Sequence, residues 1–203
     1  MERNAMFEAI RHNLTNLANI SGRDSRSTFW FYLLFLAIVY ALFSFGLSIV
    51  AGGAIAVDAF QAARDGADEA AIQQNVMSGM GNMIRISMWG SVIMSFLMTM
   101  LLAASFTRRL HDSNKPGWIA GVAVGLQLLS VALTIGMIGE MVSFVGSLKT
   151  EDPTAMQVAV QAHRTKYALS GLLSWVPVLL VIVFGIWPSS DGDNIYGPEP
   201  EHL

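Results

Sequence analysis

The chain has 203 residues, which fits one domain, and 53% of them are hydrophobic while only 13% carry a charge. Charged residues are therefore about half as frequent as in typical soluble proteins. The net charge of −3, with Lys and Arg scattered along the chain, does not favour a nucleic-acid-binding protein. Cysteine is absent, which excludes disulfides, thiolate metal sites and cysteine nucleophiles.

The first element expected in chain order is an amphipathic interfacial helix at about residues 5–20. Its apolar residues Phe7, Ile10, Leu14 and Leu17 recur at spacings of three and four, and polar residues occupy most other positions. This pattern is typical of a helix that lies on a membrane surface. A helix packed on the loops of the same protein explains the pattern equally well.

Four stretches are long and apolar enough to cross a membrane, for which a helix needs about 20 apolar residues. None of them has an ionisable residue in its interior. They lie at about residues 28–53, 86–107, 117–139 and 167–187, and a polar tail follows at 188–203. We therefore predict an all-α integral membrane protein, in which residues 1–203 form a single membrane domain with a bundle of four transmembrane helices.

The distribution of Lys and Arg predicts the orientation of this bundle. Seven of these residues fall on the side of the N-terminus: Arg3, Arg11, Arg23, Arg26, Arg108, Arg109 and Lys115. Five fall on the other side: Arg64, Arg85, Lys149, Arg164 and Lys166. Because cytoplasmic loops are enriched in Lys and Arg, we predict a bacterial inner (plasma) membrane protein with both termini in the cytoplasm.

The two loops on the opposite side are expected to be largely helical. The alanine-rich segment 58–74 favours a helix, and Glu151-Asp152-Pro153 is a plausible helix start. Three methionines follow the first of these segments at intervals of three, at positions 77, 80 and 83. Thioethers suit Cu(I), but the chain has 12 methionines, and methionine also fills gaps in apolar surfaces. We expect no metal site and no cofactor.

Three short clusters of polar and aromatic residues share the cytoplasmic side, because an even number of predicted crossings separates each pair. They lie at residues 22–30, 108–118 and 192–198. The first precedes the first span, the second forms the turn between the second and third spans, and the third follows the fourth span. We expect the three clusters to meet in space.

The clusters are similar to motifs of the YhaH-like family of small bacterial inner-membrane proteins. The shared patterns are Gly-Arg-x-x-Arg-x-x-Phe-Trp at 22–30, Arg-Arg-Leu-His-Asp at 108–112 with Gly-Trp at 117–118, and Asn-x-Tyr-Gly-Pro at 194–198. The resemblance covers nearly the whole chain and implies a multi-span protein without an established activity, since the family is catalogued as a domain of unknown function. This chain departs from the family at Thr28, where an acid is common, and in its longer external loops.

The basic residues of the clusters predict an anion or lipid-headgroup site, because guanidinium groups bind phosphate bidentately and cations attract anionic lipid. The candidate residues are Arg23, Arg26, Arg108, Arg109, His111, Asp112 and Lys115. The tail adds a cytoplasmic motif of Asn194, Tyr196, Gly197 and Pro198. In the alternative interpretation the cations only set the orientation, and Asp112 pairs with Arg23 or Arg26 to fasten the helix ends.

These features favour a non-enzymatic protein that binds anionic lipid or a membrane-protein partner through its basic face. His111 and Asp112 could form a general base with its orienting acid, but adjacent residues rarely point at each other and no nucleophile is evident. The alternative function is a small transporter or channel for an uncharged solute. An ion-coupled carrier is not favoured, because such carriers usually have ionisable residues within their spans.

A glycine stripe in the third span predicts close helix packing. Gly117, Gly121 and Gly125 are four residues apart and share one helix face. Small residues at this spacing let helix backbones approach closely. The contact could form within the monomer or between two copies in a homo-oligomer.

Overall fold

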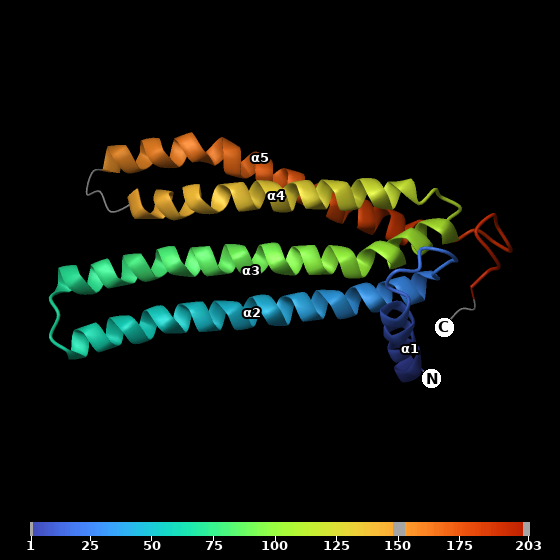
Figure 1. The fold of residues 1–203 in the computed structure, drawn as a ribbon, viewed down its shortest axis with the longest axis horizontal. Coiled ribbons are helices and arrows are strands. Elements are labelled where there is room, and N and C mark those ends of the chain that lie inside the picture. The colour runs from blue at the N-terminus through green and yellow to red at the C-terminus, as the bar shows by residue number, and fades with distance from the viewer. Residues whose placement is uncertain (1, 148–152, 201–203) are drawn as a thin grey trace. The chain divides into compact units, whose positions relative to one another are not determined.

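The computed structural model describes residues 2–147 and 153–200, and within these ranges the chain is all-helical (Figure 1). The helices are α1 (Glu2–Thr15), α2 (Arg26–Arg64), α3 (Glu69–Asp112), α4 (Trp118–Ser147) and α5 (Pro153–Ile186). The described residues form no strand, and an isolated β-bridge joins Asn194 and Gly197. The predicted all-α class is confirmed.

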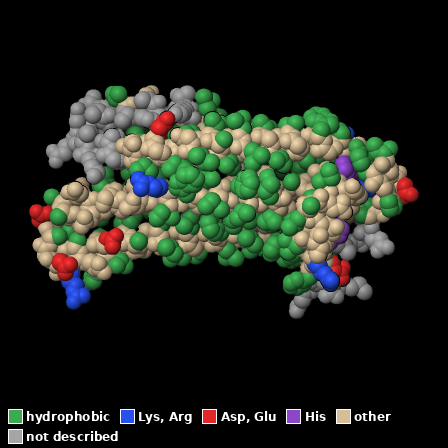
Figure 2. Space-filling model, in the orientation of Figure 1, with side chains coloured by type: hydrophobic (Ala, Val, Ile, Leu, Met, Phe, Trp, Pro, Cys, Tyr) green, Lys and Arg blue, Asp and Glu red, His purple; other side chains and the backbone are tan. Residues whose placement is uncertain are grey.

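Helices α2 to α5 are long and apolar enough to cross a membrane, with 18-residue windows of mean hydropathy between 1.8 and 2.5. Each of the four predicted stretches lies inside one of these helices or extends past its end by one residue. Hydrophobic side chains cover much of their surface on the face drawn in Figure 2. Pro177 lies inside α5 without ending it, so the helix continues past the missing backbone donor.

The turn between α2 and α3 is much shorter than the predicted loop, because both helices extend into it. Gly66 adopts a φ of 78°, a left-handed conformation that ends helices and that glycine adopts without strain. Asp68 then caps α3, since its Oδ1 accepts a hydrogen bond of 2.7 Å from the Ala71 amide. The helical prediction for 58–74 is therefore confirmed on both sides of this turn. On the other loop, α5 begins at Pro153, while Glu151 and Asp152 lie outside the described residues.

Helix α1 begins and ends earlier than predicted, at residues 2 and 15 instead of about 5 and 20. The reason lies in its last turn. Thr15 Oγ1 donates to the carbonyls of Arg11 and His12, and Asn16 Nδ2 also donates to the His12 carbonyl. These side chains occupy the carbonyls that a continuing helix would bond, so they favour a turn at this point.

The described chain divides into two compact units. The first comprises Met1–Ala41, Ser95–Ser130 and Leu172–Leu203, and the second comprises Leu42–Met94 and Val131–Gly171. The first unit contains both chain ends and all three sequence clusters. In the second unit, Gly79 of α3 faces α2, and a Cβ there would lie 3.0 Å from Ile55 Cγ1.

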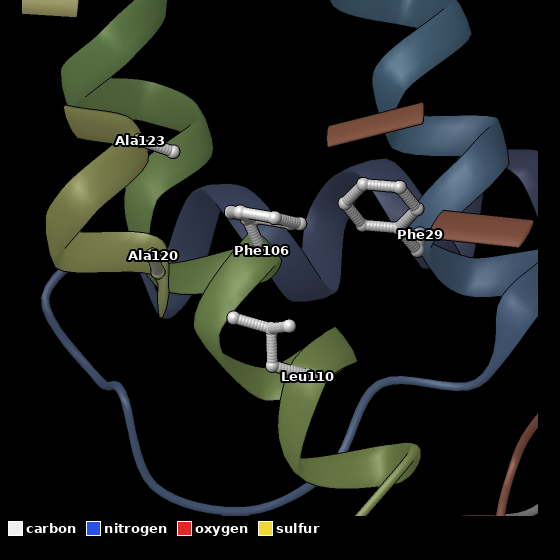
Figure 3. Packing of buried hydrophobic residues seen from close by; sticks show 5 residues of the cluster. All are labelled: Phe29, Phe106, Leu110, Ala120 and Ala123. Atoms are coloured by element: carbon white, nitrogen blue, oxygen red, sulfur yellow. The ribbon is translucent and has the colours of Figure 1, made fainter. Parts of the chain in front are cut away.

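The apolar core of the first unit joins α2, α3 and α4 (Figure 3). Phe29 of α2 lies beside Phe106 of α3, with ring centroids 6.2 Å apart. Leu110, Ala120 and Ala123 complete the cluster. Helix α5 packs on Phe29 through Gly185, where a Cβ would lie 2.8 Å from Phe29 Cε1.

Candidate functional site

A buried polar cluster occupies the end of the first unit, where α1, the start of α2, the end of α3 and the tail after α5 meet. Its members are at most 8% exposed: Asn13, Arg23, Asp24, Arg108, Arg109 and Asp112. Burying so many charges is costly unless each is paired and hydrogen-bonded. The pairing therefore defines what the cluster can do.

Asp112, at the end of α3, connects the first two sequence clusters to the start of the tail. Its Oδ1 accepts hydrogen bonds from Nε and Nη2 of Arg23, at 3.2 and 3.1 Å. Its Oδ2 accepts from Arg109 Nη1 and, at 2.5 Å, from Ser189 Oγ. The Arg23 pair is the helix-end fastening that the alternative sequence interpretation described.

Arg23 uses all of its donors within the protein. Beyond Asp112, its Nη2 donates to the Ser190 carbonyl at 2.8 Å, and its Nη1 donates to the carbonyls of Gly192 and Gly197 at 2.7 and 3.4 Å. These three carbonyls belong to the tail, in which Gly192 has a φ of 68°. The guanidinium thus holds the tail against the end of α3.

A second buried pair, Asp24 and Arg108, holds α1. Asp24 Oδ1 accepts from Arg108 Nε at 2.9 Å and from His12 Nε2 at 3.2 Å, and its Oδ2 accepts from Ser105 Oγ at 3.1 Å. Arg108 also donates to Asn13 Oδ1 at 2.6 Å. Burial alone would raise the pKa of Asp24, but the hydrogen bonds from His12 and Arg108 outweigh it and hold that pKa below its usual range. The carboxylate is therefore ionised at neutral pH.

Arg109 caps the C-terminal end of α5. Its Nε donates to the Gly185 carbonyl at 3.2 Å, and its Nη2 donates to the Trp187 carbonyl. The last carbonyls of a helix have no partner within the helix, and a cation is favourable beside them. Trp30 Nε1 also donates to the Gly185 carbonyl, at 3.2 Å. The end of α5 is thus fixed from both α2 and α3.

His111 contacts the tail motif instead of Asp112. Its ring stacks on Tyr196 with centroids 3.9 Å apart, and its Nδ1 donates to the Gly22 carbonyl at 3.2 Å. Asn194 Nδ2 donates to the His111 carbonyl at 2.9 Å. Within the described residues His111 therefore lacks the orienting carboxylate that a general base would use. Nor do any three His, Cys, Asp or Glu side chains in those ranges lie close enough to hold a metal ion.

Two of the candidate cations lie outside the buried cluster. Arg26, the first residue of α2, is exposed, and its side chain makes no hydrogen bond or ion pair with any described residue. Lys115 Nζ lies over the Trp187 ring, 5.0 Å from its centroid. Pro198, from the tail motif, is also exposed.

The glycine stripe of α4 is not uniform. A Cβ at Gly117 would lie 3.0 Å from Thr107 Cγ2 and 3.1 Å from His111 Nε2, so Gly117 lets α3 and α4 approach at their turn. A Cβ at Gly121 or Gly125 would meet no described atom within 4 Å.

The structure confirms that the three sequence clusters meet, and it adds residues that sequence reasoning missed. Asn13, Asp24 and Ser189 were not candidates, although each bonds a candidate arginine or aspartate. Asp24 lies between two candidate arginines in the sequence, and this acid flanked by cations was the available signal. Ser189 and the tail carbonyls gave no such signal.

A comparison with protein families gives a match over most of the chain. A family model described as "Protein of unknown function (DUF805)" matches residues 17–198. The match includes all three clusters and leaves out α1, and it confirms the resemblance to a family of unknown function. No curated protein and no solved structure matches the chain.

Proposed function

We propose that this chain, which belongs to the DUF805 family of proteins of unknown function, is a multi-pass membrane protein that binds anionic phospholipid. The binding surface is the end of the first unit, with the buried polar cluster beneath it. The proposal places this end at the cytoplasmic face of a bacterial inner membrane, as the distribution of Lys and Arg indicates. The proposed role is non-enzymatic.

The position of α1 is the observation that carries the proposal. Figure 1 shows α1 lying crosswise to α2, beside the start of that helix. Its buried side, at Ala9 and Asn13, faces the protein, while Phe7 and Leu14 are 67% and 42% exposed. If α2 crosses a membrane, α1 lies along the membrane surface, where exposed apolar side chains enter the boundary between headgroups and acyl chains.

The cations available for lipid are the exposed ones, Arg11 and Arg26, with Lys115 close to Trp187. Each basic residue near an anionic leaflet contributes about 1 kcal/mol of attraction. The guanidinium groups of Arg23 and Arg108 already donate to carboxylates and carbonyls, so an anion would have to displace these acceptors. In the proposal they position α1 and the tail instead.

Lipid retention measured by native mass spectrometry tests this proposal. The full chain is reconstituted in nanodiscs of phosphatidylcholine with phosphatidylglycerol. The protein is then released from the nanodisc in the spectrometer, and the phospholipid that stays bound is identified by its added mass. We expect the double variant Arg11→Gln, Arg26→Gln to lose about 2 kcal/mol of affinity for phosphatidylglycerol, or some 30-fold, because two attractions are removed.

The matched control is Arg64→Gln, Arg85→Gln, which removes the same charge from exposed positions in the second unit. It should retain phosphatidylglycerol like the wild type. Equal losses in both double variants, or no loss in either, would contradict a lipid surface at the first unit.

A further inference from the structure

The first unit contains a cavity of about 800 Å³ between α2, α3, α4 and α5. Its walls are mostly apolar and include the aromatic rings of Trp30, Tyr40, Phe106 and Trp175. A few polar side chains, among them Gln127 of α4 and Thr99 of α3, also face it. This size and this mixture are typical of sites for small lipophilic molecules, which measure roughly 300–1,000 Å³.

The cavity opens to the surface of the unit along apolar segments. Leu34 and Trp175 line it and are 50% and 62% exposed. Both lie within the stretches that are apolar enough to cross a membrane. In a membrane the surroundings of such an opening are hydrocarbon chains of lipids, so a lipid chain can enter from the side.

On α2, a cation lies about one helical turn before the first residue of the cavity wall. Arg26 and Trp30 are four residues apart on α2, so they share a helix face, and Trp30 lines the cavity while Ala37 continues its wall. On α3 the wall ends at Phe106, and the buried polar cluster begins at Arg108. Arg26, which has no carboxylate partner among the described residues, thus lies about one helical turn beyond the apolar wall.

We propose that this cavity holds one hydrocarbon chain of an anionic phospholipid whose phosphate lies at Arg26. The inference rests on the proposed function and specifies how the lipid is held. An apolar cavity with a cation at its end matches a molecule that has a hydrocarbon tail and an anionic head. A helix from a second copy fits poorly, because a helix is about 10–12 Å across and the volume would take less than about two turns of it.

Photocrosslinking of the full chain in nanodiscs tests the inference. The probe is phosphatidylglycerol with a diazirine at the end of one acyl chain, in a background of phosphatidylcholine, and labelled peptides are identified by mass spectrometry. We expect labels on cavity-lining residues of α2, α3 and α5. Ala37→Phe, which fills the cavity, should reduce this labelling at least tenfold.

Ala41→Phe is the matched control, because Ala41 is an exposed alanine one turn further along α2 that does not line the cavity. A second pair is available on α5, where Val178 lines the cavity and Leu179 does not. Val178→Trp should therefore reduce labelling and Leu179→Trp should not, which keeps the test decisive if Ala37→Phe fails to fold. Labelling spread over the outer helix faces, or unchanged in both cavity-filling variants, would overturn the inference.

The same diazirine on phosphatidylcholine separates this inference from the proposed function. We expect Arg26→Gln to reduce labelling by the phosphatidylglycerol probe about fivefold and to leave the phosphatidylcholine probe unchanged. Equal labelling by both probes in the wild type would overturn the anionic ligand and with it the proposed function. Labels absent from the cavity while phosphatidylglycerol is still retained at Arg11 and Arg26 would overturn only this inference.

Discussion

In the first unit the buried side chains include three arginines and two aspartates, whereas in the second unit the buried side chains that the structure describes are apolar. The second set consists of Ala51, Val92, Met94, Met137, Ile138 and Val145. The ion pairs of Asp24 with His12 and Arg108, and of Asp112 with Arg23 and Arg109, lie in the first unit. The buried side chains of the two units therefore differ in kind, charged and polar groups being buried in the first.

The difference shows where the geometry of the protein is specified. Apolar helix faces gain little from the hydrophobic effect when they associate in a membrane, because lipid chains are as apolar as leucine. A buried charge is more demanding, since any arrangement that leaves it unpaired costs several kcal/mol. The polar cluster thus determines how α1, the ends of α3 and α5 and the tail fit together, and the surface proposed to bind lipid is built on it.

The largest expected effect comes from breaking the polar cluster at Asp112. Asp112→Asn removes the charge that pairs with Arg23 and Arg109 and leaves both guanidinium groups buried. We expect the free energy of unfolding to fall by about 3–5 kcal/mol, the cost of a buried charge without its partner. Unfolding in mixed micelles, followed by helix content, measures it.

Asp58→Asn in the second unit is the control, because Asp58 is exposed on α2. Surface substitutions usually change stability by no more than about 0.5 kcal/mol. If the two variants lost equal stability, the contrast between the units would be wrong.

A smaller effect is expected from adding one methyl group in each unit. A Cβ at Gly185 would lie 2.8 Å from the ring of Phe29, which is fully buried and packed on Phe106. A Cβ at Gly90 would lie 2.5 Å from Leu47 Cδ2, the end of a flexible side chain. We expect Gly185→Ala to cost about 1–3 kcal/mol through overpacking.

Gly90→Ala should be nearly neutral, since Leu47 can change rotamer and alanine favours the helix over glycine by about 1 kcal/mol. The same unfolding measurement compares the two variants. A larger loss from Gly90→Ala would mean that the second unit is packed as rigidly as the first.

The fold and the meeting of the three clusters could be predicted from sequence because both follow from simple patterns. Runs of apolar residues give the spans, and an even number of crossings puts the clusters on one side. The pairing within the site could not be predicted to the same degree. Sequence reasoning offered Asp112 either Arg23 or Arg26 as its partner, and the structure pairs it with Arg23 and Arg109.

The remaining contacts of the site, and the end of α1, could not be predicted from the sequence for a physical reason. Arg23 and Arg109 complete their hydrogen bonds with backbone carbonyls of Gly192, Ser190, Gly185 and Trp187, and every residue has a carbonyl, whatever its side chain. The early end of α1 depends on local competition by Thr15 and Asn16, which a pattern of apolar residues does not report.

The smallest expected effect is on the pH dependence of stability, because burial and hydrogen bonding shift the pKa of Asp24 in opposite directions. Hydrogen bonds from His12 and Arg108 prevail, so this pKa is lower in the folded protein than in an unfolded chain. The ionised carboxylate is then favoured by folding. Its contribution is complete above the pKa of an unfolded Asp, about 3.9, and is lost as the pH falls through the lower folded value.

We therefore expect the free energy of unfolding of the wild type to fall below about pH 4, and to fall less steeply in Asp24→Asn, which has no proton to bind at this position. Unfolding in mixed micelles at pH 7 and at pH 3 measures both slopes. Asp65→Asn, at an exposed residue of the second unit, should keep the slope of the wild type. If Asp24→Asn also kept it, the acid sensitivity would belong to other carboxylates, and the link from Asp24 to Arg108 and α1 would not be what acid breaks.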